Sequence, residues 1–224
     1  SGGKVVLEYG QGAVAANNTS KYDFGLTSTG FAGKINLKAG QNFDTKLGSD
    51  GVVTNWTVIT ELGSAGDENS NVANSLQSIG NSANLAGNFV LGADIDGSST
   101  STWNSDGSSG YYGFMPIGQI YTNLTNQPFS GKFDGLGHAI SNLTMRHEID
   151  RFYTGLFGYA NNSSVFRNLM LDSFSISSSF KGVGVASLVG VVANASVSNI
   201  NVKNLSLTVN NTSGVSVYPS NPYI

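Results

Sequence analysis

The feature that most constrains the fold is an internal repeat of roughly 30 residues. Gly155–Gly158 (GLFG) returns as Ser187–Gly190 (SLVG) at an offset of 32 residues, and Asn168–Leu171 returns as Asn199–Val202 at an offset of 31. Ile140–Thr144 is a partial third copy. We place the change of offset in a turn between Val165 and Asn168, with Val165 still aligned to Val197. A constant period of this length predicts a stack of similar units.

Each copy contains about three short segments in which apolar and polar residues alternate. The clearest set is 187–191, 197–202 and 205–209, separated by Asn or Ser. Alternation indicates a strand with one buried face, and three short strands per unit predict an all-β chain coiled into a parallel β-solenoid. Stacked Asn side chains at the turns are expected to hydrogen-bond from coil to coil. The predicted interior residues are Leu156, Val165, Leu169, Leu188, Val197 and Ile200.

A further match near the start extends the prediction over the whole chain. Lys4–Gln11 recurs as Lys34–Gln41 at an offset of 30. The 224 residues then predict roughly seven coils, which would form a rod ~35 Å long. A short helix is expected within 67–86 and a long loop at 97–130. The predicted organisation is one β-helix segment, with N-terminal coils at 1–60, a helix and loop insertion at 61–130, and repeat coils at 131–224.

Charge and composition exclude several classes of protein. The net charge is −3 and charged residues make up 11% of the chain, so clustered Lys and Arg for nucleic acid are missing. The absence of Cys rules out disulfides and thiolate metal sites. The sequence contains no apolar run of about 18 residues, which a membrane-spanning helix would need. A Cys-free β chain rich in Asn, Gly, Ser and Thr is typical of an exported bacterial protein.

Several segments resemble the repeats of secreted exoproteins. These are Leu91–Asp96, Pro116–Gly118, Phe129–Ile140, Gly3–Gln11 and Ala39–Phe43. Together they are similar to the filamentous-haemagglutinin-like and high-molecular-weight adhesins exported by two-partner secretion. Gly155–Gly158 matches the GLUG motif of that repeat family, and Ser187–Gly190 matches it with Ser in place of the first Gly.

The resemblance implies a right-handed parallel β-helix, secreted to the bacterial cell surface through an outer-membrane pore partner. It implies a non-enzymatic adhesin segment of a longer exoprotein, with roles in virulence and biofilm formation. Both ends of the chain look cut from something longer, and exposed end coils predict some self-association. The expected partner is a host-cell or biofilm glycan or a receptor protein. No cofactor, metal or nucleic acid is expected.

The chain also contains residues that would suit catalysis on polysaccharides. A lyase or hydrolase needs paired carboxylates with a basic residue nearby. The candidates are Asp94, Asp96, Asp106, Asp134, His138 and Arg146. The simpler interpretation is that Asp94 and Asp96 cap turns or bind backbone amides. Asp94, Asp96, Asn104 and Asp106 would also offer oxygen ligands to Ca²⁺, but their spacing fits no known loop. We therefore predict no catalytic and no metal site.

Sequons for Asn glycosylation are about twice as frequent as chance predicts, and some high-molecular-weight adhesins carry hexoses on such residues. The alternative is that turn Asn and strand Ser or Thr coincide. The eleven positions are Asn17, Asn18, Asn55, Asn123, Asn142, Asn161, Asn162, Asn194, Asn204, Asn210 and Asn211.

Aromatic residues gather in the irregular middle of the chain. The simpler interpretation of Phe114, Phe152 and Tyr159 is that they fill the solenoid interior or cover its edge, and it is favoured for the two Phe residues. A Tyr ring offers a flat apolar face and a hydroxyl, which suits sugar recognition, and Arg pairs with carboxylates. The predicted ligand surface spans 97–130 and 146–154, through Trp103, Tyr111, Tyr112, Tyr121, Arg146, Arg151 and Tyr153.

Three functions follow from these observations. The first is a rigid adhesin segment that presents loops to a glycan or protein. The second is a structural spacer in a long exoprotein, including one that carries a distal toxin. The third is a polysaccharide-active enzyme, which the low charge and the lack of an acid–base cluster make the weakest of the three.

Overall fold

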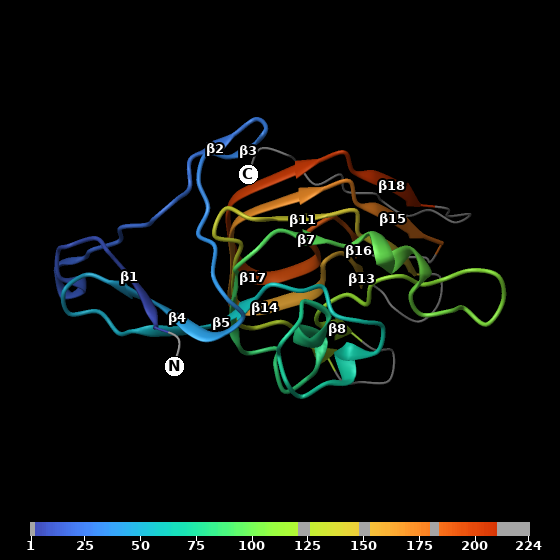
Figure 1. The fold of residues 1–224 in the computed structure, drawn as a ribbon, viewed down its shortest axis with the longest axis horizontal. Helices are drawn as coiled ribbons and strands as arrows, with labels where there is room; N and C mark the ends of the chain where they lie inside the picture. The colour runs from blue at the N-terminus through green and yellow to red at the C-terminus, as the bar shows by residue number, and fades with distance from the viewer. Residues whose placement is uncertain (1–2, 121–125, 148–152, 180–183, 210–224) are drawn as a thin grey trace.

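The computed structural model describes residues 3–120, 126–147, 153–179 and 184–209. It is all-β, with parallel coils stacked into a β-solenoid of about four turns (Figure 1). Within these residues, no helix is long and apolar enough to cross a membrane. The strands are β1 (Val5–Tyr9), β2 (Leu26–Thr27), β3 (Gly30–Phe31), β4 (Gly40–Leu47), β5 (Thr54–Ile59), β6 (Asn88–Leu91), β7 (Ile95–Asp96), β8 (Gln119–Ile120), β9 (Asn126–Gln127), β10 (Lys132–Asp134), β11 (Ala139–Ser141), β12 (Thr144–His147), β13 (Tyr153–Thr154), β14 (Phe157–Asp172), β15 (Ser175–Ser178), β16 (Gly184–Val185), β17 (Val189–Lys203) and β18 (Ser206–Val209).

Equivalent interior residues stack from coil to coil. Ile95 in β7, Ile140 in β11, Leu171 in β14 and Val202 in β17 occupy one position in four successive coils, joined by parallel pairing. The separations from Ile140 to Leu171 and from Leu171 to Val202 are both 31 residues, as the repeat predicts. The separation from Ile95 to Ile140 is longer because the loop after β7 is inserted there. Parallel stacking lets each coil bury its apolar face only against its neighbours.

The interior is filled largely by phenylalanine rings. Phe157 lies with its ring centroid 4.7 Å from that of Phe166, 4.8 Å from Phe129 and 5.3 Å from Phe133. All four side chains are fully buried. Phe114 is also fully buried, as predicted, whereas Tyr159 is half-buried and Phe152 lies outside the described residues.

Asparagines turn the chain at the corners of the coils. Asn168 and Asn199 occupy equivalent corners with φ of 54° and 52°, in the left-handed region that Asn tolerates. Asn199 Nδ2 donates to Asn168 Oδ1 at 3.1 Å. At other corners, Asn204 Nδ2 donates to Asp172 and Asn194 Nδ2 donates to Ser163. The prediction that Asn side chains link neighbouring coils is confirmed.

The predicted interior position of Val165 is wrong. Phe157 pairs with Val189 at an offset of 32, but Phe166 pairs with Val197 at 31, because the register shifts between Asn161 and Ser164. The shift precedes Val165, which we had aligned with Val197. A one-residue shift moves a side chain to the other face, so Phe166 points inward and Val165 is half-buried.

The other predicted interior residues lie inside. Leu156, Leu169 and Leu188 are buried in the core. Val197 and Ile200, which belong to the last coil, are partly buried and pack against the same core.

The N-terminal part departs from the predicted coils. β1 pairs with β4 in parallel at an offset of 38, not 30, and β4 pairs with β5 antiparallel. Residues 34–39 form no strand. The likeness of Lys4–Gln11 to Lys34–Gln41 therefore does not mark a coil, and the solenoid has about four coils rather than seven. The number of alternating residues in each segment is too small to fix its partner.

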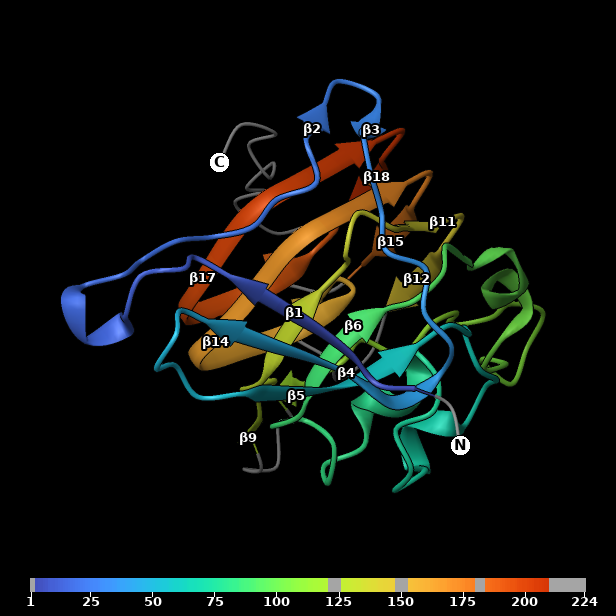
Figure 2. The same cartoon turned by 60° about the vertical axis from the view of Figure 1, so that its left-hand side comes forward.

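Residues 20–38 instead form a strap that crosses the side of the stack (Figure 2). Leu37 N donates to Gly92 O at 3.0 Å and Ile35 N donates to Leu136 O at 3.2 Å. Farther along the stack, Asn201 Nδ2 donates to Thr27 O at 3.0 Å. The strap thus reaches from the first coil to the last, and it joins residues far apart in sequence.

The helix expected within 67–86 is not an α-helix. Two 3₁₀-helices occur there, η2 (Asp67–Asn69) and η3 (Gln77–Gly80). Side chains compete with helical hydrogen bonding: Ser78 Oγ accepts from the backbone N–H of Ser75 and donates to its carbonyl, and Asn84 Nδ2 donates to Ser78 O. Two further 3₁₀-helices are η1 (Val14–Ala16) and η4 (Ser98–Thr102).

Candidate functional site

The predicted ligand surface centres on a loop, residues 104–113, that projects from the solenoid beside β12. Asp106 fixes the loop from within, since its Oδ1 accepts from Ser108 N at 2.8 Å and from Gly110 N at 3.1 Å. Its Oδ2 pairs with Arg146 Nη2 on β12 at 3.2 Å. Arg146 N also donates to Tyr112 O at 2.7 Å. The loop is therefore anchored at both its turn and its return to the coil.

The aromatic residues predicted for this surface differ in exposure. Tyr111 is 42% exposed, whereas Tyr112 and Tyr153 are half-buried. Trp103 is only 9% exposed and packs in the main core, so its ring presents no free face to a ligand. Sequence reasoning could not separate it from Tyr111, because both follow Gly- and Ser-rich segments with no alternation. Two other predicted residues, Tyr121 and Arg151, lie outside the described residues.

Asp106 gives the loop a defined response to acid. Hydrogen bonds from Ser108 and Gly110, with the Arg146 guanidinium, hold the pKa of the Asp106 carboxyl below its ordinary value. The charged form thus persists below about pH 4, and its contribution is lost only as the pH falls through the lowered pKa. We expect the amide NMR signals of Ser108 and Gly110 to titrate with a midpoint below about 4. Asp106→Asn should abolish that transition, and a midpoint at or above the ordinary value would contradict it.

The carboxylates considered for catalysis serve the strap and the turns. Asp94 Oδ1 accepts from His138 Nδ1 and Ala139 N, both at 3.0 Å, and Lys34 Nζ binds Oδ2 at 2.7 Å. The His138 side chain is almost fully buried, and its Nε2 lies 2.9 Å from Ile35 O on the strap. Both ring nitrogens are engaged, so this pair is a structural clamp between strap and coil.

Asp96 binds its own turn and the next coil. Its carboxylate accepts from Ser98 N at 3.1 Å and from Asn142 Nδ2 at 3.0 Å. The interpretation of Asp94 and Asp96 as turn caps and amide binders is confirmed. The oxygen ligands considered for Ca²⁺ are not brought together, because Asp94 faces Lys34 while Asp106 faces Arg146. Among the described residues, His, Asp and Glu form no group of three that could hold a metal.

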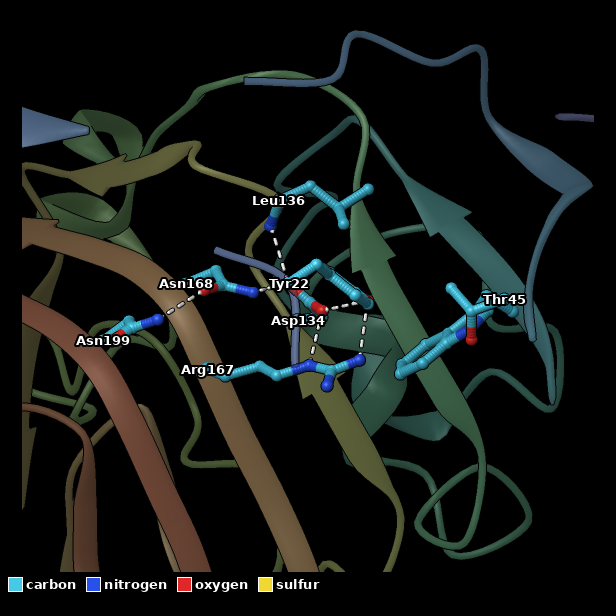
Figure 3. Close-up of polar contacts among 8 residues, drawn as sticks. Tyr22, Thr45, Asp134, Leu136, Arg167, Asn168 and Asn199 are labelled. Carbon is cyan, nitrogen blue, oxygen red and sulfur yellow. Dashed lines mark hydrogen bonds and ion pairs between the residues drawn. The ribbon is translucent and has the colours of Figure 1, made fainter. Parts of the chain in front are cut away.

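The strongest polar cluster lies beneath the strap around Asp134 (Figure 3). Asp134 is fully buried, and its Oδ2 accepts from Tyr22 Oη and from Arg167 Nε, both at 2.6 Å. Its Oδ1 accepts from Leu136 N and Asn168 Nδ2 at 2.9 and 3.1 Å. Four donors thus satisfy one buried carboxylate.

Tyr22 completes this cluster from the strap. Arg167 Nη2 donates to Tyr22 Oη at 2.6 Å, and the guanidinium carbon lies 4.4 Å from the Tyr22 ring centroid. Burial and the neighbouring Asp134 carboxylate raise the pKa of Tyr22 far above its ordinary value. Sequence reasoning missed Tyr22 and Arg167, since they are 145 residues apart and only the strap brings them together.

The sequon asparagines differ in hydrogen bonding and in exposure. Asn18, Asn55, Asn142, Asn194 and Asn204 donate their side-chain nitrogens to protein acceptors. Asn17 and Asn162 are exposed residues at positive φ. Asn161 is half-buried, and Asn123, Asn210 and Asn211 lie outside the described residues. Glycosylation stays a prediction, and Asn17 and Asn162 suit it best, because they are exposed and, among the described residues, their side chains make no hydrogen bond to protein.

Comparison with known proteins gives one similar sequence. This chain is 38% identical to Halomucin of Haloquadratum walsbyi over 122 residues. The aligned part is 54% of this chain and 1% of the length of Halomucin. No family model and no solved structure matches. The β-solenoid and this similarity are compatible with a surface-exposed structural or adhesin-like protein.

Proposed function

We propose that this chain is a non-enzymatic, rigid segment of a long cell-surface exoprotein, and that its 104–113 loop attaches to glycans. The observation that carries the proposal is the exposed Tyr111 on a loop held by Asp106, Asn104 and Arg146. A pre-ordered loop binds without the entropy cost of ordering it, and a Tyr ring stacks on the apolar face of a sugar.

The engagement of the polar groups supports a structural role over an enzymatic one. Asp134 and His138 are buried and their polar atoms face protein partners. A general acid or base must reach the proton that it transfers, and neither side chain is open to a substrate. We therefore propose that the chain catalyses no reaction on polysaccharides.

The similarity to Halomucin supports an extracellular, surface location. The aligned part is a very small share of that protein, which supports a place for this chain within a long polypeptide. The resemblance to two-partner-secreted adhesins, with GLUG-type repeats and an outer-membrane pore partner, stays part of the proposal and rests on the motifs alone.

The test is binding to a glycan array, followed by titration of each glycan that binds. Replacing Tyr111 by Ala should weaken binding about tenfold or more, because the ring supplies the stacking surface. The melting temperature should stay near that of wild type, since the side chain is exposed. Tyr111 is a better target than Tyr112, whose partial burial would mix binding with folding.

Two controls make the test specific. Tyr111→Phe keeps the ring and should retain most of the binding, and Val72→Ala removes an exposed apolar group elsewhere and should change nothing. Wild-type protein that binds no glycan, or Tyr111→Ala protein that binds normally, would contradict the loop as the attachment site.

The spacer function is the second candidate, and a different observation favours it. Among the described residues β17 pairs on one side only, with β14, so a further coil of the same repeat could stack on its other side. A spacer would bind none of the glycans and would still melt as one cooperative unit. The array distinguishes the two functions.

A further inference from the structure

His138 is enclosed between two hydrogen-bond acceptors, one from the coil and one from the strap. Its Nδ1 lies 3.0 Å from Asp94 Oδ1, and its Nε2 lies 2.9 Å from the carbonyl oxygen of Ile35. The His138 side chain is 1% exposed, so solvent does not replace either partner. These two contacts therefore decide how the ring is protonated.

Two acceptors require two protons on the ring. Carboxylate and carbonyl oxygens accept hydrogen bonds and donate none, whereas a neutral imidazole has a single N–H. In either neutral tautomer, one nitrogen lone pair of His138 would face the lone pair of an oxygen. Both contacts are hydrogen bonds only in the imidazolium form, which carries a positive charge.

The Asp94 carboxylate supplies the balancing negative charge. Partial burial raises the pKa of Asp94, but hydrogen bonds from Lys34, Ala139 and His138 outweigh that effect and hold the pKa below its ordinary value. Lys34, the strap residue next to Ile35, binds the second carboxylate oxygen at 2.7 Å. Asp94 therefore stays ionised wherever the pH is above about 4.

The other charged groups of the neighbouring elements have partners of their own. They are Arg167 on β14, which pairs with Asp134 on β10, and Asp96 on β7, which accepts from Ser98 and Asn142. Tyr22 on the strap stays uncharged, because burial raises the pKa of its hydroxyl far above the ordinary value. The charge of the imidazole is therefore set by the Asp94–Lys34 pair and the Ile35 carbonyl.

We propose that His138 is a pH-sensitive latch, which holds the strap at Ile35 while its ring carries two protons and releases it when one is lost. The proton that leaves is the one on Nε2, because the charged Asp94 oxygen is a stronger acceptor than the Ile35 carbonyl. The Nε2 lone pair then faces the Ile35 oxygen, and the contact becomes repulsive. Release is local, since the strap stays attached through Tyr22 and Thr27. The latch does not depend on glycan binding by the 104–113 loop.

The direction of the pH response follows from the proton count. The closed latch binds a proton that the open latch gives up, so the closed form is favoured at low pH and is lost as the pH rises through the titration of His138. Histidine is the side chain that ordinarily changes charge between about pH 5 and 8. At the acid end, the latch is lost only as the pH falls through the lowered pKa of Asp94, below about 4.

An NMR spectrum that correlates ring protons with ring nitrogens tests the proton count directly. At about pH 5.5 the wild-type chain should show N–H signals at both Nδ1 and Nε2 of His138, and at about pH 8 the Nε2 signal should be lost. His147→Gln removes the only other histidine of the sequence, so the signals that remain belong to His138. A His138 ring with a single N–H at about pH 5.5 would overturn the proposal.

Hydrogen exchange of the strap amides measures the release. Ile35 N donates to Leu136 O and Leu37 N donates to Gly92 O, so both amides report on the strap beside His138. Their protection, relative to an unstructured peptide at the same pH, should fall about tenfold or more between about pH 5.5 and 8, because a hydrogen bond to a charged group is lost. The amides of β15, which lies between β12 and β18, should keep their protection.

His138→Gln is the matching variant, since its side-chain amide never carries a charge. Strap protection in this variant should be the same at both pH values, whereas His147→Gln should keep the wild-type response. If His138→Gln protein does not fold, the wild-type spectra and exchange rates decide alone. Equal strap protection at both pH values in the wild type, or a His138→Gln chain that responds as the wild type does, would overturn the latch.

Discussion

Replacing Leu169 with arginine is expected to abolish cooperative folding near room temperature. Leu169 is fully buried in the main core and pairs across the stack with Ile200. A guanidinium at this position has no partner among Phe and Leu side chains. The free-energy cost of burying an unpaired charge is larger than the loss that a typical domain, stable by ~5–15 kcal/mol, can tolerate. Urea or thermal unfolding followed by circular dichroism measures the loss.

Val165→Arg is the matched control for this prediction. Sequence repetition alone places Val165 inside, whereas the register shift before Ser164 leaves it half-buried on the other face. Its replacement should change the free energy of unfolding by less than about 1 kcal/mol. Equal damage by both substitutions would refute the observed register, and wild-type melting of Leu169→Arg would refute the interior itself.

The second large effect is expected at Asp134. Asp134→Ala leaves the Arg167 guanidinium, 17% exposed, without its carboxylate, and removes the acceptor for three other donors. Removing one partner of a buried ion pair costs about 3–5 kcal/mol. The free energy of unfolding should fall by that amount, and the strap should detach where Tyr22 loses its contacts. Hydrogen exchange of the strap amides measures the detachment.

Lys34→Ala gives the control for strap attachment through an exposed ion pair. Lys34 and Asp94 are 43% and 53% exposed, so this pair should contribute no more than about 1 kcal/mol. The strap should stay protected in that variant. If Asp134→Ala protein keeps wild-type stability and strap protection, the cluster around Asp134 does not hold the strap.

Much of the coil could be predicted from residues near each other in sequence. Alternation in 197–202 and 205–209 indicates strands because the side-chain period of a strand is two residues. The spacing from Ile140 to Leu171 to Val202 defines which positions stack, since parallel coils repeat at a fixed length. Asn168 and Asn199 mark corners because Asn adopts positive φ at low cost.

The predictions failed where residues compete for more than one partner. Val165 was misplaced because a bulge of one residue leaves no clear signal in a Ser- and Asn-rich segment. Trp103 was grouped with Tyr111 because burial of a loop aromatic depends on what lies beneath it. For the same reason the contact between Tyr22 and Arg167 could not be predicted from the sequence.

The β-solenoid, its period and its Asn corners could be predicted from the amino-acid sequence alone, because these features depend on local periodicity and backbone preference. The crossing of the stack by residues 20–38 and the sharing of Asp134 by four donors became apparent only from the three-dimensional structure. Those features depend on which distant segments meet, and many weak pairings are nearly equal in energy until the packed interior selects one of them.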